Sequence, residues 1–244
     1  MSNELIKPHA GKLINCYCDN SKAQEYKDRA VNYSSHTLTD RQLCDLELIL
    51  NGAFSPLDGF MVQKDYNSVL DNNRLSDGNI WSIPIVLDIQ FELADSISIN
   101  DKLALRDKEG YLIAILEIND KWNYNKELEA KKVYGTTDIS HTGVRYLFEN
   151  GGDVCVGGKL IGIERPHHHD FLDIRLDPNE TREYFKNNNW DKIVAFQTRN
   201  PMHRAHKEIM QRAAEEIGGK AFLHPVVGMT KQGDVDYFTR VRCY

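Results

Sequence analysis

The sequence predicts an α/β protein with a β-rich amino-terminal domain, residues 1–168, followed by the start of a parallel sheet in residues 169–244. Two observations indicate this class. Apolar runs separated by turn residues occupy much of residues 80–164, and such runs are typical of short strands. Residues 192–227 instead suggest a strand, a polar turn, a helix and a second strand, which is the order that builds parallel sheets.

Length and composition fit one large domain or two ordinary ones. The chain has 244 residues, of which 41% are hydrophobic, and this is enough to bury a core. The formal net charge of −6, with both signs interspersed, argues against a nucleic-acid partner. We expect no membrane span and no secretion signal, because no apolar run reaches about 18 residues. Five cysteines without a Cys-x-x-Cys pair indicate reduced thiols and a cytoplasmic protein.

The first part of the chain, residues 1–37, is expected to form turns because it shows little hydrophobic periodicity. Cys16 and Cys18 are candidate metal ligands by residue type. Their separation by two residues is the wrong spacing for a zinc knuckle. We therefore expect a structural role for both.

A helix is predicted next, with Thr39 or Asp40 as its N-cap and with Asn51 and Gly52 at its end. Its apolar positions are Leu43, Leu46, Leu48, Ile49 and Leu50. The following segment, Gly52–Met61, has the glycine, proline and aspartate of a turn and two phenylalanines that can anchor it. It is expected to be a packed loop.

The residue pattern in the middle of the chain is typical of a β domain. Residues 80–89 are predicted to form a strand, and Lys102–Arg106 is predicted to pair with Tyr111–Ile118 across the turn Asp107–Gly110. Further predicted elements are helices near Asn125–Val133 and Thr142–Phe148 and a strand at Val154–Glu164. This mixture favours a compact, barrel-like domain.

The segment Arg165–Asp170 contains three consecutive histidines and an aspartate and is predicted to be a polar linker between the domains. A metal site is disfavoured, because adjacent side chains point in different directions and cannot easily converge on one ion. Asp177 or Asn179 then caps a predicted helix through Phe185, which the asparagines 187–189 end.

The strand–turn–helix unit begins with Ile193–Phe196, an apolar, β-prone run that predicts a buried parallel strand. Asn200 is a suitable N-cap for the helix, and Pro201 suits its first position. The pair Gly218-Gly219 ends the helix, and Ala221–Val227 is the second predicted strand. The apolar side of the helix consists of Ile209, Met210, Ala213, Ala214 and Ile217.

The turn between this strand and this helix predicts an anion site. In such units ligands bind beyond the carboxyl ends of the strands, where free N–H groups and the helix dipole favour anions. Arg199 can bind a tetrahedral oxyanion through two parallel hydrogen bonds, and His203 and His206 share one helix face. Other polar residues of the turn are Gln197, Thr198 and Arg204. We expect the site to accept phosphate-like groups.

A second loop, residues 228–234, follows the second strand and is expected to lie beside the first in a parallel sheet. It would add Lys231, and Arg240 from the following helix, to the anion site. Asp234 or Asp236 is expected to cap that helix, and the chain is expected to end within it.

Four segments of the chain resemble the ATP sulfurylase (sulfate adenylyltransferase) family. Gln197–His206 matches every fixed position of the family pattern Gln-x-Arg-Asn-Pro-x-His-x-x-His. Gly52–Met61, His224–Lys231 and Gly233–Tyr244 resemble further family segments in the same order, so that nearly the whole chain fits. The resemblance implies a PUA-like barrel for the first domain. For the second it implies a Rossmann-like sheet of the HUP nucleotidyltransferase type.

The resemblance also implies an enzyme that reversibly joins sulfate to the adenylyl group of ATP and releases pyrophosphate, in sulfate assimilation or sulfur oxidation. It implies that Gln197 and Arg199 hold sulfate, and that Thr198, Arg199 and Asn200 form the catalytic loop. The ATP-binding residues that it implies are Gln197, Thr198, Arg199, Asn200, His203 and His206. Mg²⁺ would accompany ATP, with no protein metal site and no tightly bound cofactor. The partners would be ATP, sulfate, adenosine 5′-phosphosulfate and pyrophosphate, with a homo-oligomer once the protein is complete.

Several alternatives stay open. Asn200 could serve only as a cap, and His206 could be an ordinary half-buried helix residue. A zinc site at His203 and His206 would need a third ligand. The protein could also be a nucleotidyltransferase for another acceptor, or a noncatalytic PUA-type RNA-binding module, although its acidic charge argues against RNA.

The family's second nucleotide-binding element, a Gly-Arg-Asp-His segment, does not occur in the 244 residues. We therefore expect the chain to correspond to the amino-terminal part of the enzyme and to have little activity alone.

Overall fold

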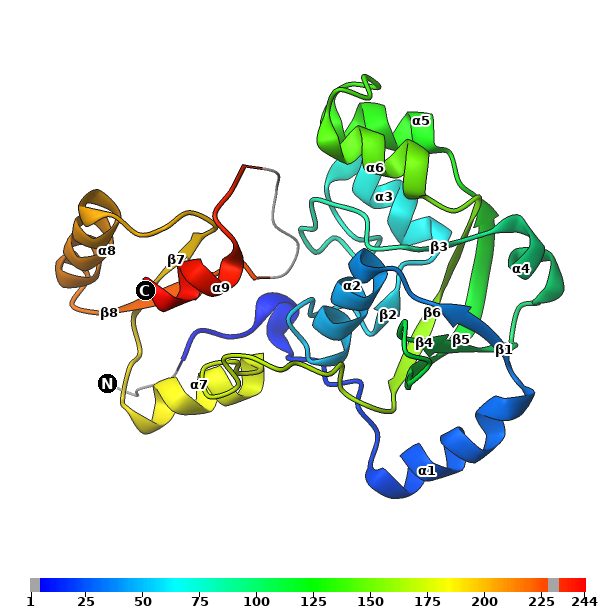
Figure 1. Cartoon of the computed structure of the whole chain (residues 1–244), viewed down its shortest axis with the longest axis horizontal. Coiled ribbons are helices and arrows are strands. Elements are labelled where there is room, and N and C mark those ends of the chain that lie inside the picture. The colour runs from blue at the N-terminus through cyan, green and yellow to red at the C-terminus, as the bar shows by residue number, and fades with distance from the viewer. Residues whose placement is uncertain (1–4, 228–232) are drawn as a thin grey trace. The chain divides into compact units, whose positions relative to one another are not determined.

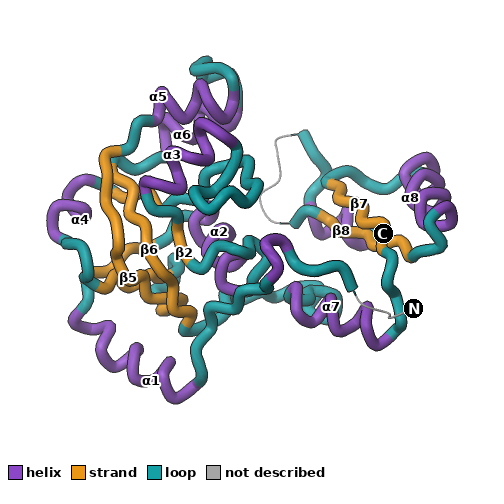
Figure 2. The backbone as a smooth tube through the Cα atoms, turned by 180° about the vertical axis from the view of Figure 1, so that it is seen from behind, coloured by secondary structure: helices purple, strands orange, loops and turns teal. Residues whose placement is uncertain are grey.

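The structure is a computed structural model that describes residues 5–227 and 233–244. It divides into two compact units (Figures 1 and 2). The larger unit is Lys7–Pro178, and the smaller unit is Asn179–Tyr244 together with the first residues of the chain. The predicted division after residue 168 stays a prediction.

A mixed six-stranded sheet forms the centre of the larger unit. The strands in order across the sheet are β1 (Ser34–Thr37), β4 (Lys102–Arg106), β5 (Leu112–Asn123), β6 (Val154–Gly162) and β2 (Gly59–Phe60), while β3 (Leu87–Ile89) also pairs with β6. The β1–β4 pair is parallel and the other pairs are antiparallel. Strand β6 thus has three partners, β5, β2 and β3. The predicted β4–β5 hairpin and the predicted strand at β6 are confirmed.

Helices surround this sheet. They are α1 (Asn20–Arg29), α2 (Asp40–Leu50), α3 (Gln63–Asn72), α4 (Phe91–Ser96), α5 (Lys126–Glu129), which continues into a π-helical turn (Ala130–Tyr134), and α6 (Thr142–Asn150), with 3₁₀ turns at His9–Gly11 and Ala30–Asn32. Helix α2 begins with a capping box in which the side chains of Thr39 and Gln42 each accept from the other residue's backbone N–H. Thr39 rather than Asp40 is therefore the N-cap. The largest core cluster joins α2 and α3 to the strands and includes Leu46, Ile49, Val69, Leu87 and Leu103.

Two sequence predictions for this unit are wrong. Residues 20–29 and 34–37, predicted as turns, form α1 and β1. Helix α1 buries only Ala23, so its amphipathic pattern is weak. The predicted strand 80–89 is a strand only at Leu87–Ile89, because Pro84 has no N–H for a ladder.

The residues with metal-ligand side chains in this unit contact separate partners. The ring of His167 packs edge-on against Tyr111, while His168 Nε2 lies 2.7 Å from a carboxylate oxygen of Glu47. Cys16 Sγ donates weakly to the carbonyls of Ile49 and Asp58. Burial raises the pKa of the Cys16 thiol to about 11, and the negative charge of Asp58 adds to the effect. All five cysteines are free.

Gly52, just after α2, is expected to be one of the least tolerant positions of the fold. Its φ is +90°, and a Cβ there would lie 2.1 Å from the carbonyl oxygen of Ile14. We expect Gly52→Ala to lower the free energy of unfolding by about 2–4 kcal/mol, through strain and the backbone clash. Gly78→Ala is the matched control, since φ is +94° there and nothing lies within 4 Å of its Cβ. Urea denaturation should show the larger loss for Gly52→Ala, and equal losses would contradict the clash.

Glu129 is expected to make the stability of the larger unit depend on pH. It is 7% exposed, its Oε1 accepts from the Tyr124 hydroxyl at 2.9 Å, and its Oε2 has no hydrogen-bond partner among the described residues. Burial raises the pKa of the Glu129 carboxyl, against the opposing effect of the hydrogen bond from Tyr124. Because the folded-state pKa lies above the unfolded value, the contribution of Glu129 to the free energy of unfolding is fully present below about pH 4.3. This contribution is lost as the pH rises through the folded-state pKa.

Glu129→Gln should therefore flatten the fall in stability above about pH 4.3 and make the protein more stable at neutral pH. Glu127→Gln, an exposed change on the same helix, is the control. Urea denaturation at a series of pH values measures both variants. A Glu129→Gln curve parallel to that of the parent protein would contradict the prediction.

The smaller unit contains α7 (Pro178–Asn187), β7 (Ile193–Thr198), α8 (Arg204–Glu216), β8 (Lys220–Pro225) and α9 (Tyr237–Arg242). Strands β7 and β8 pair in parallel from Ile193–Lys220 to Thr198–Pro225, which confirms the predicted strand–helix–strand unit. Helix α7 begins at Pro178, so Asn179 lies inside it and is not its cap. The rings of Phe185 on α7 and Phe222 on β8 pack edge-to-face at 5.4 Å.

Strand β7 is less buried than the sequence predicts. Ala195 and Gln197 are exposed, and among the six residues of the strand only Thr198 is buried. The sheet has two strands in the described part of the chain, so each strand has a neighbour on one side only. For helix α8 the apolar face is covered in part: Ala214 is buried, but Ile209 is 60% exposed.

Candidate functional site

The candidate site is the loop between β7 and α8, where the chain makes a tight turn around Thr198. This residue is 7% exposed, and its Oγ1 accepts from the Asn200 N–H at 3.1 Å and contacts the Asn200 carbonyl oxygen at 3.3 Å. The Tyr244 hydroxyl donates to the same carbonyl oxygen at 2.6 Å. Arg199 stands between these two fixed residues, with 54% of its side chain exposed.

Helix α8 begins later than the sequence predicts. Its first residue is Arg204 and His203 occupies the N-cap position, without a side-chain capping bond. The prediction of Asn200 as N-cap and Pro201 as first helical residue is therefore wrong. Thr198 engages the Asn200 N–H and Tyr244 its carbonyl, and these contacts hold Asn200 in the turn. As a result His203 stands at the end of the helix where N–H groups are free and the dipole favours anions.

The two histidines lie against each other at the start of α8. The ring centroids of His203 and His206 are 3.7 Å apart with an interplanar angle of 30°, and the His206 ring is 5.6 Å from that of Phe196. His206 Nδ1 is buried without a hydrogen-bond partner among the described residues. The interpretation of His206 as a satisfied helix residue therefore loses support. An imidazole nitrogen can donate to or accept from a ligand oxygen.

The residues predicted for the site thus come from three adjacent places. Gln197 and Thr198 end strand β7, where side chains alternate between the two faces, so that Gln197 is exposed and Thr198 buried. Arg199 and Asn200 form the turn, and the two histidines follow at the start of α8. Lys231 lies outside the described residues.

Arg240 does not join the anion site in the way that the sequence predicts. It is 2% exposed, its Nε–H donates to the Val235 carbonyl at 2.8 Å, and its Nη1–H donates to the Val226 carbonyl at 3.0 Å. Asp236 caps α9 by accepting from the Thr239 N–H at 2.9 Å, as one of the two predicted alternatives. Helix α9 ends at Arg242, so the chain does not end within it.

Sequence reasoning missed two residues of this site. Asp234 Oδ2 lies 3.9 Å from Arg199 Nε, a long and partly solvated ion pair. Tyr244 holds Asn200, which is 44 positions earlier in the chain. No local pattern could have shown either contact, because both join segments that are distant in sequence.

The described residues offer no ready metal site, since they contain no group of three or more His, Cys, Asp or Glu side chains that could hold an ion. A nucleotide-bound Mg²⁺ needs no such group, because it keeps waters and takes only one or two carboxylates. Asp234 is the carboxylate that the structure places beside the loop.

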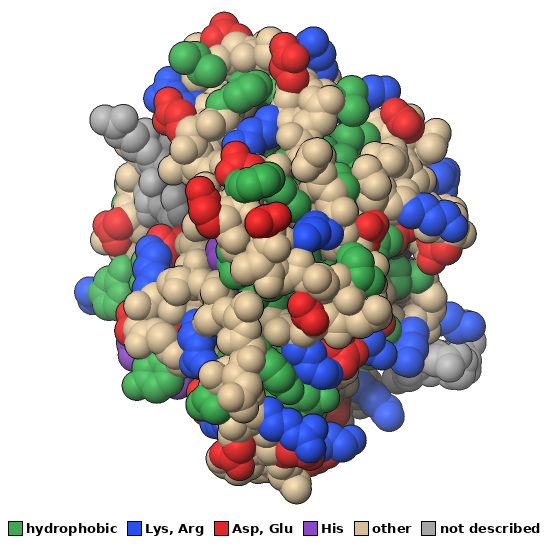
Figure 3. All heavy atoms as spheres, turned by 90° about the vertical axis from the view of Figure 1, so that its right-hand side faces the viewer, with side chains coloured by type: hydrophobic (Ala, Val, Ile, Leu, Met, Phe, Trp, Pro, Cys, Tyr) green, Lys and Arg blue, Asp and Glu red, His purple; other side chains and the backbone are tan. Residues whose placement is uncertain are grey.

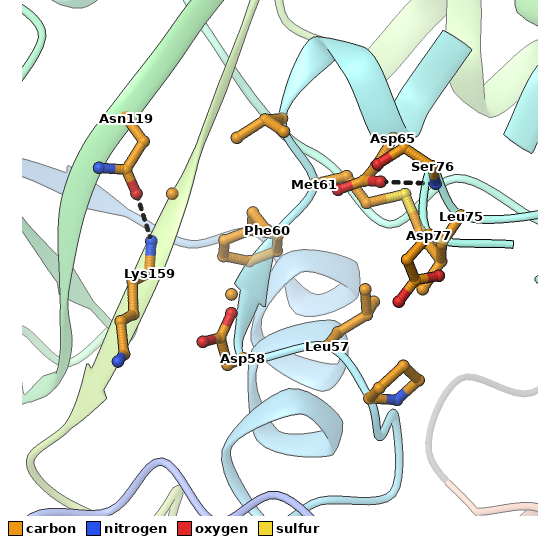
Figure 4. A pocket seen from close by; sticks show the side chains of 14 residues that line it. Leu57, Asp58, Phe60, Met61, Asp65, Leu75, Ser76, Asp77, Asn119 and Lys159 are labelled. Atoms are coloured by element: carbon orange, nitrogen blue, oxygen red, sulfur yellow. Dashed lines mark hydrogen bonds between the residues drawn. The ribbon is translucent and has the colours of Figure 1, made fainter. Parts of the chain in front are cut away.

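A polar hollow of about 370 Å³ lies in the larger unit, away from the predicted site residues in sequence. Figure 4 shows Asp65 and Asp77 on one side of it and Asn119 and Lys159 on the other. Asp65 accepts from the Ser76 N–H and Asn119 from the Lys159 N–H. These contacts stabilise the hollow's own walls, and nothing in it repeats the chemistry of the loop.

These features define an α/β protein in which a β-rich unit is joined to a parallel strand–helix–strand unit that presents an arginine and two histidines at the carboxyl end of a strand. The comparisons with known proteins agree with this class. Residues 6–165 match the family model of the PUA-like domain, and residues 172–244 match that of ATP-sulfurylase. Residues 172–244 therefore belong to the ATP sulfurylase family, and residues 6–165 to that of the PUA-like domain.

The curated relatives that the chain resembles carry one name. It is 51% identical to the sulfate adenylyltransferase of Schizosaccharomyces pombe, over 91% of this chain and 46% of the relative. It is 48% identical to that of Gibberella zeae, over 97% of this chain and 42% of the relative. The chain therefore spans about half the length of these relatives or less. Among solved structures, a hexameric APS kinase from Thiobacillus denitrificans superposes with a TM-score of 0.79 at 33% identity, over 98% of this chain and 43% of that one.

Proposed function

We propose that the protein is a sulfate adenylyltransferase, which joins sulfate to the adenylyl group of ATP and releases pyrophosphate, reversibly, in sulfate activation or sulfur oxidation. The observation that carries the proposal is the fixed turn at the end of β7, which presents Arg199 to solvent between Thr198 and Asn200. The names of the relatives, at about half identity over most of this chain, support it.

The proposed work of Arg199 and Gln197 is to hold sulfate. Both residues are exposed, Gln197 near the end of β7 and Arg199 just after it. The guanidinium supplies a permanent charge and a bidentate hydrogen-bond geometry, and the Gln197 amide adds a neutral donor. Because both substrates are anions, the rate depends mainly on holding them together and on stabilising charge around the attacked α-phosphorus. Thr198, Arg199 and Asn200 are the proposed catalytic loop.

The proposed work of the histidines is to bind the phosphates of ATP. His203 occupies the end of α8, where the helix dipole attracts phosphate oxygens, and the unpartnered His206 Nδ1 is free among the described residues to take up a hydrogen bond. Both would stabilise the negative charge that gathers on the departing pyrophosphate. Mg²⁺ would enter with ATP and neutralise part of the same charge.

The proposal also covers the fold of the two domains and the state of the complete protein. We infer that the first domain, residues 1–168, is a PUA-like barrel and that residues 169–244 begin a HUP-type nucleotidyltransferase sheet, to which the parallel β7–β8 pair would belong. A cytoplasmic homo-oligomer is proposed for the complete protein. No helix in the described ranges is long and apolar enough to cross a membrane.

The competing interpretation is a PUA-type module that binds RNA. The net charge of −6 weighs against it, because RNA-binding surfaces are rich in basic side chains. On the face drawn in Figure 3, acidic and basic side chains are interspersed. That pattern does not favour an RNA backbone on this face.

The test is the reverse reaction of the full-length protein, with adenosine 5′-phosphosulfate and pyrophosphate as substrates and ATP detected by luminescence. We expect ATP formation that needs both substrates. Formation of ATP only from a different adenylylated acceptor would favour another nucleotidyltransferase. Salt-sensitive RNA binding without any ATP formation would overturn the proposal.

A further inference from the structure

Helix α9 and the residues around it lie beside the β7–β8 pair (Figure 1), and they reach the candidate loop at two points, one directly and one through Val226. The first point is Tyr244, whose hydroxyl donates to the Asn200 carbonyl at 2.6 Å. This contact fixes the peptide unit between Asn200 and Pro201, while the unit that directly follows Arg199 is held by the bond from the Asn200 N–H to Thr198 Oγ1. Tyr244 itself is half-buried, so its ring is packed and its hydroxyl is aimed at the turn.

The second point is Arg240, which acts through one intervening residue, Val226, just after β8. Its guanidinium donates to the carbonyl of Val226, and the N–H of Val226 donates to the carbonyl of Thr198 at 2.9 Å. Arg240 also donates to the Val235 carbonyl. One buried side chain therefore contacts both Val226 and Val235 and, through Val226, fixes the peptide unit that precedes Arg199.

The two contacts hold the two neighbours of Arg199. Arg240 holds Thr198 through Val226, and Tyr244 holds Asn200. Thr198 Oγ1 links these neighbours by accepting from the Asn200 N–H. We propose that Arg240 and Tyr244 are positioning residues that fix the backbone of Arg199 in the orientation that binds the anion. This inference rests on the proposed function of Arg199.

The physical reason is the entropy of the turn. A loop residue that is free to sample several backbone conformations must lose that freedom when its side chain grips a ligand, and affinity falls accordingly. Contacts that order the residue beforehand remove this cost. Neither Arg240, which is 2% exposed, nor the Tyr244 hydroxyl needs to touch the anion for this effect.

The test uses the full-length protein and the KM for sulfate or adenosine 5′-phosphosulfate. Tyr244→Phe removes only the hydroxyl, and loss of one hydrogen bond predicts a KM higher by about three- to tenfold. Arg240→Met should raise it by more than about tenfold, because both carbonyls lose their donor, and Arg240→Lys should restore part of the loss. The urea midpoint should change little in Tyr244→Phe.

The matched controls are Arg242→Met, an exposed arginine of the same helix, and Tyr184→Phe, a half-exposed tyrosine of α7. Both should leave KM unchanged. A second readout needs no activity: trypsin should cleave after Arg199 faster in Tyr244→Phe than in Tyr184→Phe, since the turn is looser.

Two results would overturn the inference. One is a Tyr244→Phe protein with the KM of the Tyr184→Phe control. The other is an Arg240→Met protein that is destabilised but binds the anion normally. If Arg199→Ala also leaves anion binding unchanged, the proposed function itself is wrong, and the two failures are thereby distinguished.

Discussion

Replacement of Arg199 by alanine is expected to lower kcat/KM for adenosine 5′-phosphosulfate by about 10²–10³-fold, which is the usual effect of removing one donor that stabilises an oxyanion. The guanidinium is the permanent positive charge of the turn, and it is presented to solvent between two fixed residues. Arg199→Lys keeps the charge and loses the two parallel hydrogen bonds. We therefore expect an intermediate loss of about tenfold or more.

Steady-state kinetics with sulfate and with adenosine 5′-phosphosulfate measure this effect. The control is Arg212→Ala, an exposed arginine of α8 that pairs with Glu208 one turn away. It should stay within about twofold of the parent protein, since such surface pairs contribute little. If Arg199→Ala behaves like Arg212→Ala, the anion site is elsewhere.

The largest effect on stability is expected at Asp88, which links three parts of the larger unit. The carboxylate is 4% exposed. Its Oδ1 contacts the guanidinium of Arg41 and the side-chain amide of Gln42, and its Oδ2 accepts from the Gly152 N–H at 2.6 Å. Asp88→Ala leaves the Gly152 N–H without its acceptor and leaves the Arg41 guanidinium with Asp45 as its remaining carboxylate partner. Breaking a buried pair in this way costs about 3–5 kcal/mol.

Urea denaturation checks the value, with the exposed Asp95→Ala of α4 as control. Asp88→Asn keeps an oxygen for the Gly152 N–H and should lose less. A loss for Asp88→Ala no larger than that for Asp95→Ala would show that the network does not stabilise the fold.

The sequence predicted those elements whose signals are local. Thr39 and Gln42 form a capping box that can be recognised from four consecutive residues, and the β4–β5 hairpin has a polar turn between two apolar runs. It failed where the local signal was weak or misleading. Helix α1 buries one residue and so lacks periodicity, and the apolar residues before Leu87 surround a proline that prevents pairing.

The same distinction applies to the candidate site. The polar cluster at the end of β7 is contiguous in sequence, so its residues could be named before the fold was known. The start of α8 could not, because the local preference of Asn200 and Pro201 is overridden by a hydroxyl from Tyr244. The pairing of Arg199 with Asp234 likewise depends on how β8 returns beside β7. Such contacts follow from tertiary structure, to which a single sequence gives no direct access.

The central place of β6 has a consequence for synthesis on the ribosome. Strands β2, β3 and β5 all hydrogen-bond to β6, and Gly59 pairs with Lys159. While residues 154–162 are still inside the ribosome, the nascent chain already contains β2, β3 and β5 but lacks β6, the strand that pairs with all three. During that period the apolar surfaces of these segments are exposed to solvent, and folding intermediates of this kind are prone to aggregate. The larger unit should therefore complete its fold late in translation, and truncations before Val154 should bind chaperones rather than fold.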